Sequence, residues 1–329
     1  MTSIHETAYP RFKPDLTQRE LDEIYTPNET EQRFARRLGR SNASRLYLMI
    51  LLKTVQRLGY FPMVADVPPS IVSFVTKALG LKLVPLCALV EEEKSRSRRD
   101  FIDAIRAHLK IHPITKDTDK AIELAATQAA QTKQELADII NVIIEELIRQ
   151  RYELPAFSRL NRTAFRIRNQ VNELYYHTLT DPLPAAVTSQ FDAMLTLSAG
   201  QLVTGWQQIK QDPKKPTNTE VRQYLERVKW LKSWACELPQ VDHIPVVKRG
   251  QYVYEARALD AADLKAMQQN KRYALMVLLF HAQLSKALDD AVDIFVRKMR
   301  KLHSGALEQL QLYYQEHQKR AEKLVSQLR

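Results

Sequence analysis

Side chains with the types and spacing of a catalytic or metal centre are few in this sequence of 329 residues. His108 and His112 have the i, i+4 spacing that places two metal ligands on one helical face, but the sequence suggests no third ligand. The HExxH, GxSxG, Walker A and CxxC patterns are all absent from it. The sequence therefore predicts no metal centre at the histidine pair and offers no nucleophile or base that indicates an enzyme.

A tight acidic cluster lies further along the chain, in the string LDDAVDIF. Asp289 and Asp293 share a face of the expected helix, with Asp290 beside them, and carboxylates so placed could in principle hold Mg²⁺. Basic residues lie within one or two turns on either side of the cluster. A solvated face of ion pairs is therefore the favoured interpretation.

Positive charge is the more informative feature. Lys and Arg number 49 against 38 Asp and Glu, a net charge of +11, and the sequence pI is near 9.5. A polyanion is the first partner to consider, and a solvated basic surface is the alternative. Residues 31–60 hold seven basic side chains and one acid, whereas residues 115–154 hold five basic and eight acidic ones. Such blocks mark particular faces as candidates for phosphate contact.

Two stretches place basic residues at helical spacing. Over residues 95–110, arginines recur at intervals that lay a basic row along one face, as in helices that read a major groove. After Ser158 a second row occupies positions i, i+3 and i+7, and no acid occurs between residues 155 and 171. A solvated face usually mixes charge signs, so an unmixed row favours an external polyanion. The predicted DNA-contacting residues are Arg36, Arg37, Arg40, Arg45, Lys94, Arg96, Arg98, Arg99, Arg106, Arg159, Arg162, Arg166, Arg168, Lys214 and Lys215.

The elements that must position these residues are helices. Glycine is scarce, at 7 residues, and apolar side chains recur at helical spacing along most of the chain. Ser44 is a plausible N-cap and Gly59 a plausible stop for the first long helix, and Ser158 a plausible cap for a later one. Helices are predicted over residues 44–59, 68–80, 95–110, 117–131, 133–151, 158–180, 185–199, 201–211, 218–238, 261–301 and 304–329. One β-hairpin is predicted, in HIPVVKRGQYVYEA at 243–256.

The expected fold class is all-α: a multi-domain helical array with helix-turn-helix-like units, long C-terminal helices and at most one short hairpin. Residues 1–30 are expected to form an extended arm and residues 31–112 a first helical DNA-binding domain. Residues 113–240 are expected to form a second, and residues 241–329 a truncated scaffold or dimerisation region. Cys87 and Cys236 lie far apart, as in a reduced chain, and no signal peptide or membrane span is indicated.

Several strings, in order, resemble the opening of Tn3-family transposases. They are LTQRELDEIY, ASRLYLMILLKTVQRLGYFPMVADVPPSIVSFVTKALGL, RSRRDFIDAIRAHL, IINVIIEELIRQRYELPAFSRLNR at 139–162 and KRYALMVLLFHAQLSKALDDAVDIF at 271–295. The most specific string is Leu154-Pro155-Ala156-Phe157-Ser158. Members of the family commonly have histidine where Phe101 stands, which puts a polar role for that position in doubt.

The resemblance implies binding of transposon terminal inverted repeats by N-terminal helical domains. Cutting and joining in that family belong to a later RNase H-like domain with an Asp-Asp-Glu triad and divalent metal, whose β-sheet this sequence does not predict. The resemblance thus implies a bacterial, cytoplasmic, nucleoid-associated DNA-binding chain that is not an enzyme on its own. Mg²⁺ is expected only for the missing catalytic domain, and double-stranded DNA is the expected partner, with no membrane or small-molecule substrate. The alternative is a helical interaction module that forms a homodimer through its last seventy residues and binds DNA non-specifically.

Overall fold

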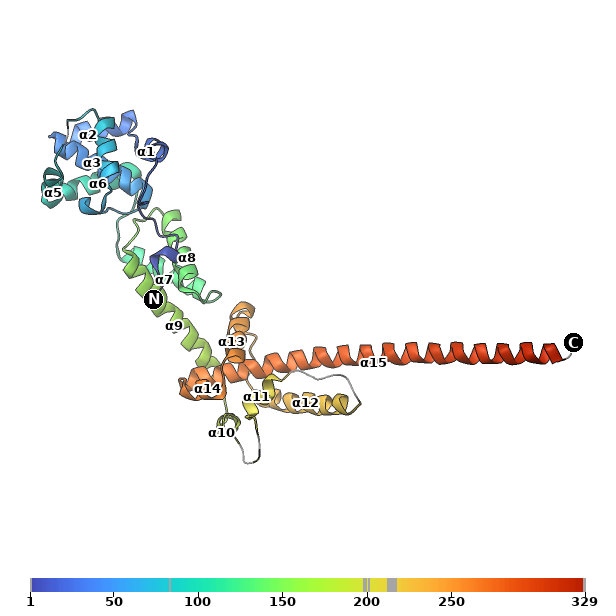
Figure 1. Cartoon of the computed structure of the whole chain (residues 1–329). Helices are drawn as coiled ribbons and strands as arrows, with labels where there is room; N and C mark the ends of the chain where they lie inside the picture. The colour runs from blue at the N-terminus through green and yellow to red at the C-terminus, as the bar shows by residue number, and fades with distance from the viewer. Residues whose placement is uncertain (1, 83, 198–199, 201, 212–217, 328–329) are drawn as a thin grey trace. The chain divides into compact units, whose positions relative to one another are not determined.

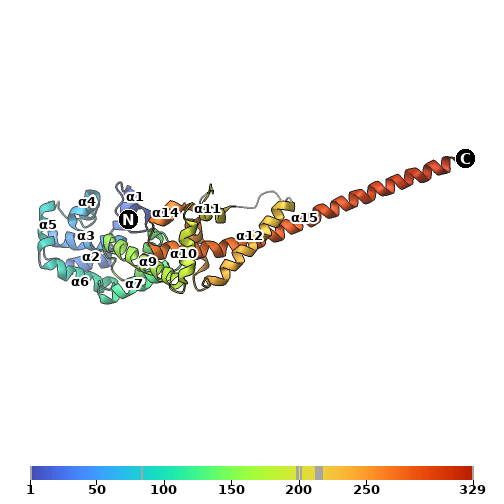
Figure 2. The same cartoon turned by 90° about the horizontal axis from the view of Figure 1, so that it is seen from below.

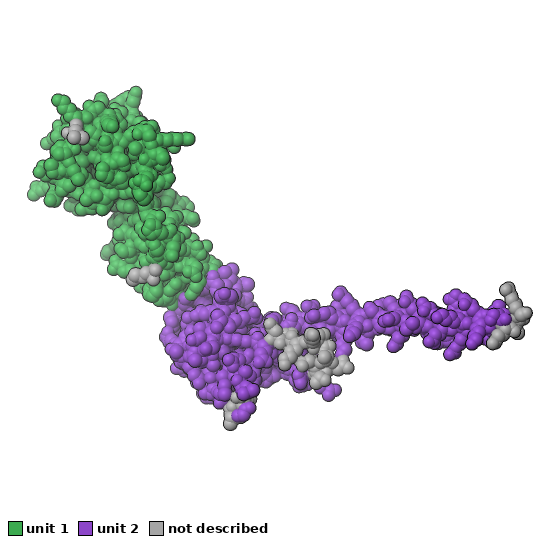
Figure 3. Space-filling view, in the orientation of Figure 1, with its two compact units in different colours: residues 1–171 green, residues 172–329 purple. Residues whose placement is uncertain are grey.

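The computed structural model describes residues 2–82, 84–197, 200, 202–211 and 218–327. Over these residues it contains fifteen α-helices and two short 3₁₀-helices, and its only β-type pairing is an isolated bridge between His112 and Tyr152. The all-α fold class is confirmed. The chain divides into two compact units, residues 1–171 and 172–329 (Figure 3). No described helix is long and apolar enough to cross a membrane.

The first part of unit 1 is a bundle built around one buried helix, α3 (Figure 1). Every residue of α3 from Leu46 to Val55 is buried, as expected of a helix covered on all sides by its neighbours. The helices of this bundle are α1 (Gln18–Tyr25), α2 (Glu29–Leu38), α3 (Asn42–Leu58), α4 (Pro69–Ala78), α5 (Leu86–Lys94) and α6 (Ser97–Leu109). The short helix α5 was not predicted from the sequence.

The ends of α3 agree only partly with the prediction. Gly59 has φ of +74° and ends the helix as predicted, because a left-handed residue at this position favours glycine. The N-cap is Ser41 rather than Ser44, and the two hydroxyls form a reciprocal capping box in which Ser44 is the third helical residue. Ser158 likewise lies inside its helix, which begins at Phe157.

The predicted extended arm, residues 1–30, is wrong in its second half. Thr17 caps α1, and Leu21 and Tyr25 of α1 are buried in the core of the first bundle. This helix was missed because it is only eight residues long, too short for a clear periodic signal.

The rest of unit 1 is a smaller group of helices: α7 (Lys116–Ala130), α8 (Leu136–Arg149) and the first part of α9 (Phe157–Thr180). In α9 the predicted apolar stripe is buried at Leu160, Ala164, Ile167 and Val171, but Leu174 is 62% exposed. The boundary between units 1 and 2 falls within α9, inside the range 113–240 for which the sequence predicts one domain.

The two helical groups of unit 1 meet at a hydrogen-bonded junction. The amide of Leu154 donates to the carbonyl of Gly59 (2.8 Å), and the amide of Glu153 donates to the carbonyl of His112 (2.9 Å). The hydroxyl of Tyr9 donates to the carbonyl of Pro155 (2.9 Å). The N-terminal segment, the end of α3 and the start of α9 are thereby fixed to one another.

Unit 2 contains α10 (Ala185–Met194), α11 (Gly205–Lys210), α12 (Asn218–Glu237), α13 (Val246–Ala258), α14 (Ala261–Ala266) and α15 (Gln269–Gln327). Its core includes stacked aromatic rings, with Phe191 5.4 Å from Trp234 and 5.6 Å from Phe280 between centroids. Tyr273–Phe280 at the start of α15 are buried in this core, whereas most of its later residues extend beyond the other helices of the unit (Figures 1 and 2).

Two predictions for this unit are wrong. The residues assigned to a hairpin form α13, in which Tyr252 and Ala256, four residues apart, are buried and Val246 is exposed, a helical rather than an alternating pattern. The two long C-terminal helices are one helix, α15, preceded by the short α14. Gly305 lies inside α15 without ending it, because one mid-helix glycine costs only about 1 kcal/mol.

The junction allows a test with two glycines of like conformation. A Cβ on Gly59 would lie 3.1 Å from the side chain of Leu154, whereas one on Gly80 (φ +65°) would meet no atom within 4 Å. Gly80→Ala should lower the free energy of unfolding by about 1 kcal/mol through backbone strain alone. Gly59→Ala should lower it by about 2–4 kcal/mol, because it adds a steric clash.

Urea unfolding followed by circular dichroism measures both losses. The chain's three tryptophans, Trp206, Trp230 and Trp234, all lie in unit 2, so their fluorescence provides an internal control. Equal losses for the two variants would contradict the described junction.

Candidate nucleic-acid interface

Helix α2 meets the C-terminal end of α6 at the surface of the first bundle. The ring of Phe34 on α2 stacks on that of His108 on α6, with centroids 4.6 Å apart. Beyond the C-terminal end of α2, the hydroxyl of Ser41, the N-cap residue of α3, donates to Glu92 of α5 (3.4 Å). The first contact joins α2 to the last turn of α6, and the second joins the start of α3 to α5.

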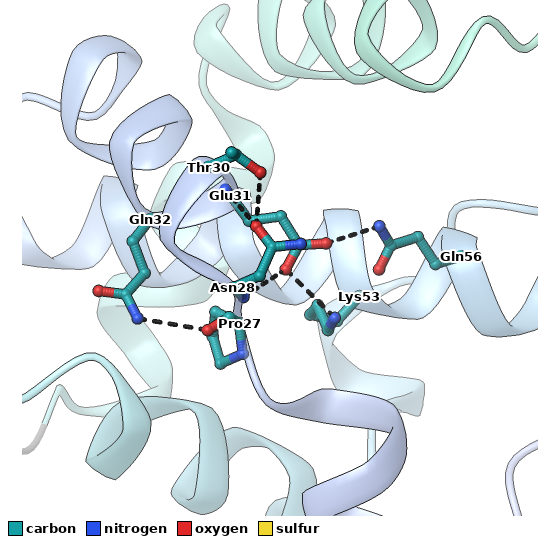
Figure 4. Close-up of polar contacts among 7 residues, drawn as sticks. All are labelled: Pro27, Asn28, Thr30, Glu31, Gln32, Lys53 and Gln56. Carbon is teal, nitrogen blue, oxygen red and sulfur yellow. Dashed lines mark hydrogen bonds and ion pairs between the residues drawn. The ribbon is translucent and has the colours of Figure 1, made fainter.

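A buried ion pair holds α2 on α3 (Figure 4). Glu31 is 3% exposed, and its carboxylate accepts from the Lys53 ammonium (3.3 Å) and the Gln56 amide (2.8 Å). It also accepts from the backbone amide of Asn28 (2.9 Å), whose side chain caps α2 in return. Because Glu31 faces inward, the arginines on the opposite side of α2 face solvent.

Six of the predicted cations of the first bundle are exposed and form no ion pair with a described residue. Arg37 lies over the Phe34 ring, 5.8 Å from its centroid, which leaves its charge available to solvent. These residues occupy α2, the turn that follows it, and the α5–α6 segment: Arg36, Arg37, Arg40, Lys94, Arg96 and Arg99. Together they form what we call the α2–α6 basic surface.

Three other predicted cations of the first bundle are engaged within the protein. Arg45 donates to the carbonyl of Gly39 (3.0 Å). Arg98 pairs with Glu93 and donates to the Tyr47 hydroxyl (3.1 Å), and burial raises the pKa of that tyrosine to about 12. Arg106 pairs with Asp103 (2.9 Å) and with the nearly buried Glu153 at the junction (2.6 Å). These arginines orient elements of the fold.

In the structure, acidic side chains lie beside the basic row on α9. Arg159 pairs with Asp119, and Arg166 pairs with Glu123 (2.5 Å), and both acids belong to α7. The premise that no acid accompanies these arginines was therefore wrong, because the acids come from a helix some 40 residues earlier. The pairs are half-exposed, so each can open at a cost of about 0–1 kcal/mol. The face nonetheless carries less net charge than its sequence indicates.

The remaining predicted residues of this region differ from one another. Arg162 is exposed and donates only to the carbonyl of Ser158 (3.3 Å). Arg168 is half-buried, donates to the carbonyl of Gln134 (3.4 Å) and stacks over the Phe165 ring. Lys214 and Lys215 lie outside the described residues.

The structure also places the two candidate metal sites. No group of three or more His, Cys, Asp or Glu side chains suited to a metal occurs among the described residues. His108 stacks on Phe34, and His112 forms the β-bridge with Tyr152. In the acidic cluster, Asp290 accepts a hydrogen bond from the Tyr224 hydroxyl (3.2 Å).

Residues 1–167 match the family described as a domain of unknown function, DUF4158. The chain belongs to this family. The DUF4158 region ends within four residues of the end of unit 1, at residue 171. The α2–α6 basic surface and the α9 row up to Arg166 thus both lie within the DUF4158 region.

Curated relatives extend the similarity beyond the DUF4158 region. The chain is 25% identical over 311 residues to the transposase for transposon Tn501 of Pseudomonas aeruginosa, covering 94% of this chain and 30% of that protein. It is 27% identical over 304 residues to the transposase for transposon Tn3926 of Escherichia coli, covering 90% and 30%. The chain therefore spans about a third of the length of these relatives, and the resemblance to Tn3-family transposases is confirmed.

Sequence reasoning missed two residues of the DUF4158 region that the structure brings to the α2–α6 basic surface. Arg33 and His108 line a cavity between α2 and α6 together with Arg37. Arg33 precedes Arg37 by four residues, so its helical spacing was a usable signal. His108 gave no such signal, because its neighbour Phe34 is far away in sequence.

The buried pair beneath α2 supplies a stability test. Glu31→Ala leaves the Lys53 ammonium buried without its partner, and we expect the free energy of unfolding to fall by about 3–5 kcal/mol. The double variant Glu31→Ala, Lys53→Met removes the stranded charge and should regain part of that loss. Chemical denaturation of the parent chain, the single variant and the double variant measures these free energies of unfolding. A single variant within about 0.5 kcal/mol of the parent would contradict the described pairing.

Proposed function

We propose that this chain is the DNA-binding N-terminal region of a Tn3-family transposase, and that it binds the terminal inverted repeats of its transposon. The transposase relatives and their coverage of most of this chain support a role in DNA transposition. The proposed partner is double-stranded DNA, and the proposed location is the bacterial cytoplasm, at the nucleoid.

The α2–α6 basic surface carries the proposal. Exposed cations without an acidic partner repel one another. A bound polyanion neutralises this repulsion, whereas water screens it only in part. Helices α5 and α6 are connected by a turn of two residues, Ser95 and Arg96. Because this turn is short, Arg96 and Arg99 lie close together at the start of α6. In this proposal α6 lies in the major groove, and the end of α2 contacts the flanking phosphates.

The proposed role does not include catalysis by this chain. Two-metal cleavage of DNA needs carboxylates held rigidly around a pair of ions, and the described residues form no such cluster. We assign the Mg²⁺-dependent steps to a catalytic domain in another part of the transposase.

A protein-interaction role is the second candidate, and the later part of α15 favours it. Large apolar side chains there are exposed, including Phe295 (65%) and Leu302 (60%). They line an apolar groove of about 290 Å³ between α12 and α15, together with Tyr224 of α12. Such a face suits a homodimer or another part of a longer protein, and sedimentation of the chain with and without serine in place of Phe295 and Leu302 separates this role from DNA binding.

The contrast between paired and unpaired arginines can be measured. On a duplex, replacing Arg36 and Arg40 by alanine should make the negative slope of log K against log[salt] shallower by about 0.9 for each phosphate that the variant no longer neutralises. Replacing Arg159 and Arg166 should change the slope by less, because each already neutralises an acid. Equal changes in the two double variants, measured by fluorescence anisotropy between 50 and 200 mM salt, would contradict the proposed surface.

Base reading is tested separately. Selection from a pool of randomised duplexes should enrich one sequence, and Arg96→Ala or Arg99→Ala should reduce preference for it by about 1–3 kcal/mol. Binding without enrichment would favour the second candidate, an interaction module with non-specific affinity.

A further inference from the structure

A cavity of about 320 Å³ opens between α2 and α6 of the DUF4158 region. It is lined by Thr30, Arg33, Phe34, Arg37 and His108. Two guanidinium groups and an imidazole therefore surround one opening, whose lining includes no carboxylate. The acid that pairs with a lining residue is Glu29, one turn before Arg33.

The floor of the cavity is already filled. Phe34 and His108 are stacked on each other with centroids 4.6 Å apart and planes inclined by 22°, which leaves no space for a third ring between them. Arg37 covers the Phe34 ring at 5.8 Å. The cavity is thus unsuited to a nucleobase inserted between the two rings. It presents N–H donors around an apolar floor.

Arg33 can be recruited to the cavity at little cost. Its guanidinium pairs with Glu29 at 3.0 Å, but the two side chains are 73% and 86% exposed. A pair this exposed contributes about 0–1 kcal/mol, less than a bidentate bond from arginine to phosphate provides. An arriving phosphate can therefore displace Glu29 from Arg33.

We propose that this cavity binds one phosphate group of a DNA backbone, with Arg33, Arg37 and His108 as donors. The inference rests on the proposed function and adds to it an anchoring point formed by α2 and the C-terminal end of α6, whereas the expected base-reading residues Arg96 and Arg99 lie at the N-terminal end of α6. The forked N–H donors of a guanidinium match the two non-bridging oxygens of a phosphodiester in a bidentate geometry. Free inorganic phosphate shares this chemistry, so the experiment has to distinguish the two sources.

The first arm measures duplex affinity of the full chain with matched charge changes. Arg33→Gln should weaken binding about three- to tenfold at 100 mM salt and make the negative salt slope shallower by less than about 0.9, because Arg33 leaves Glu29 when it binds the phosphate. Arg19→Gln is the control, because Arg19 forms the same type of exposed i, i+4 pair, with Glu23 on α1, away from this cavity. Equal losses in the two variants would overturn the proposal.

The same design predicts a gain of affinity. Glu29→Gln frees Arg33 from its acid and should tighten duplex binding, whereas Glu23→Gln should tighten it less. His108→Phe keeps an aromatic ring on Phe34 but removes the ring donors, and should weaken binding while circular dichroism stays unchanged. Affinity unchanged in both Glu29→Gln and His108→Phe would overturn the assignment of these donors.

The second arm titrates inorganic phosphate at constant ionic strength while nuclear magnetic resonance follows the His108 ring and the arginine Nε–H signals. Saturable shifts that a duplex reverses by competition support a shared phosphate site. Saturable shifts that a duplex leaves unaltered, although it binds, would show a free-anion site and overturn the proposal. If the full chain binds no duplex at all, the proposed function fails, and saturable shifts then identify a phosphate site unconnected with DNA.

Discussion

The contact on which unit 1 depends is the hydrogen bond from the amide of Leu154 to the carbonyl of Gly59. It joins the end of the buried helix α3 to the segment just before α9, and the absence of a Cβ on Gly59 lets the Leu154 side chain approach closely. Tyr9 strengthens the joint through its bond to Pro155 and its ring contact with Phe157. The string from Leu154 to Ser158, the most specific in the sequence, is therefore the place where the two helical groups of the DUF4158 region are fixed together.

Charge pairing across helices then determines which cations remain available. Arg106 and Glu153 form an ion pair at the joint itself, so a residue predicted to contact DNA instead holds α6 in position. Arg166 on α9 meets Glu123 of α7. On α2 the acid Glu31 faces inward to Lys53, and the outward Arg36 and Arg37 keep their charge for an external partner. Our account of DNA binding rests on this difference between α2 and α9.

Features set by neighbouring residues could be predicted from the sequence. The helical period identified α3, α8 and the buried stripe of α9, and the glycine stop at Gly59 was correct. Features set by distant residues could not. The stretch now in α13 has valines and a glycine, which suit a hairpin locally, but burial of Tyr252 in the core of unit 2 favours a helix. The acids that pair with the α9 row, and the stacking of His108 on Phe34, depend on contacts between segments far apart in the chain.

Amide hydrogen exchange of the full chain, with and without a bound duplex, tests the central claim most directly. DNA lying on the α2–α6 basic surface slows exchange in peptides covering residues 29–41 and 94–109, where backbone amides and their side chains meet the duplex. Peptides covering residues 157–171 should change less, because Arg159 and Arg166 of α9 are paired with acids of α7. Protection confined to residues 157–171, with none over residues 29–41 and 94–109, would contradict the account.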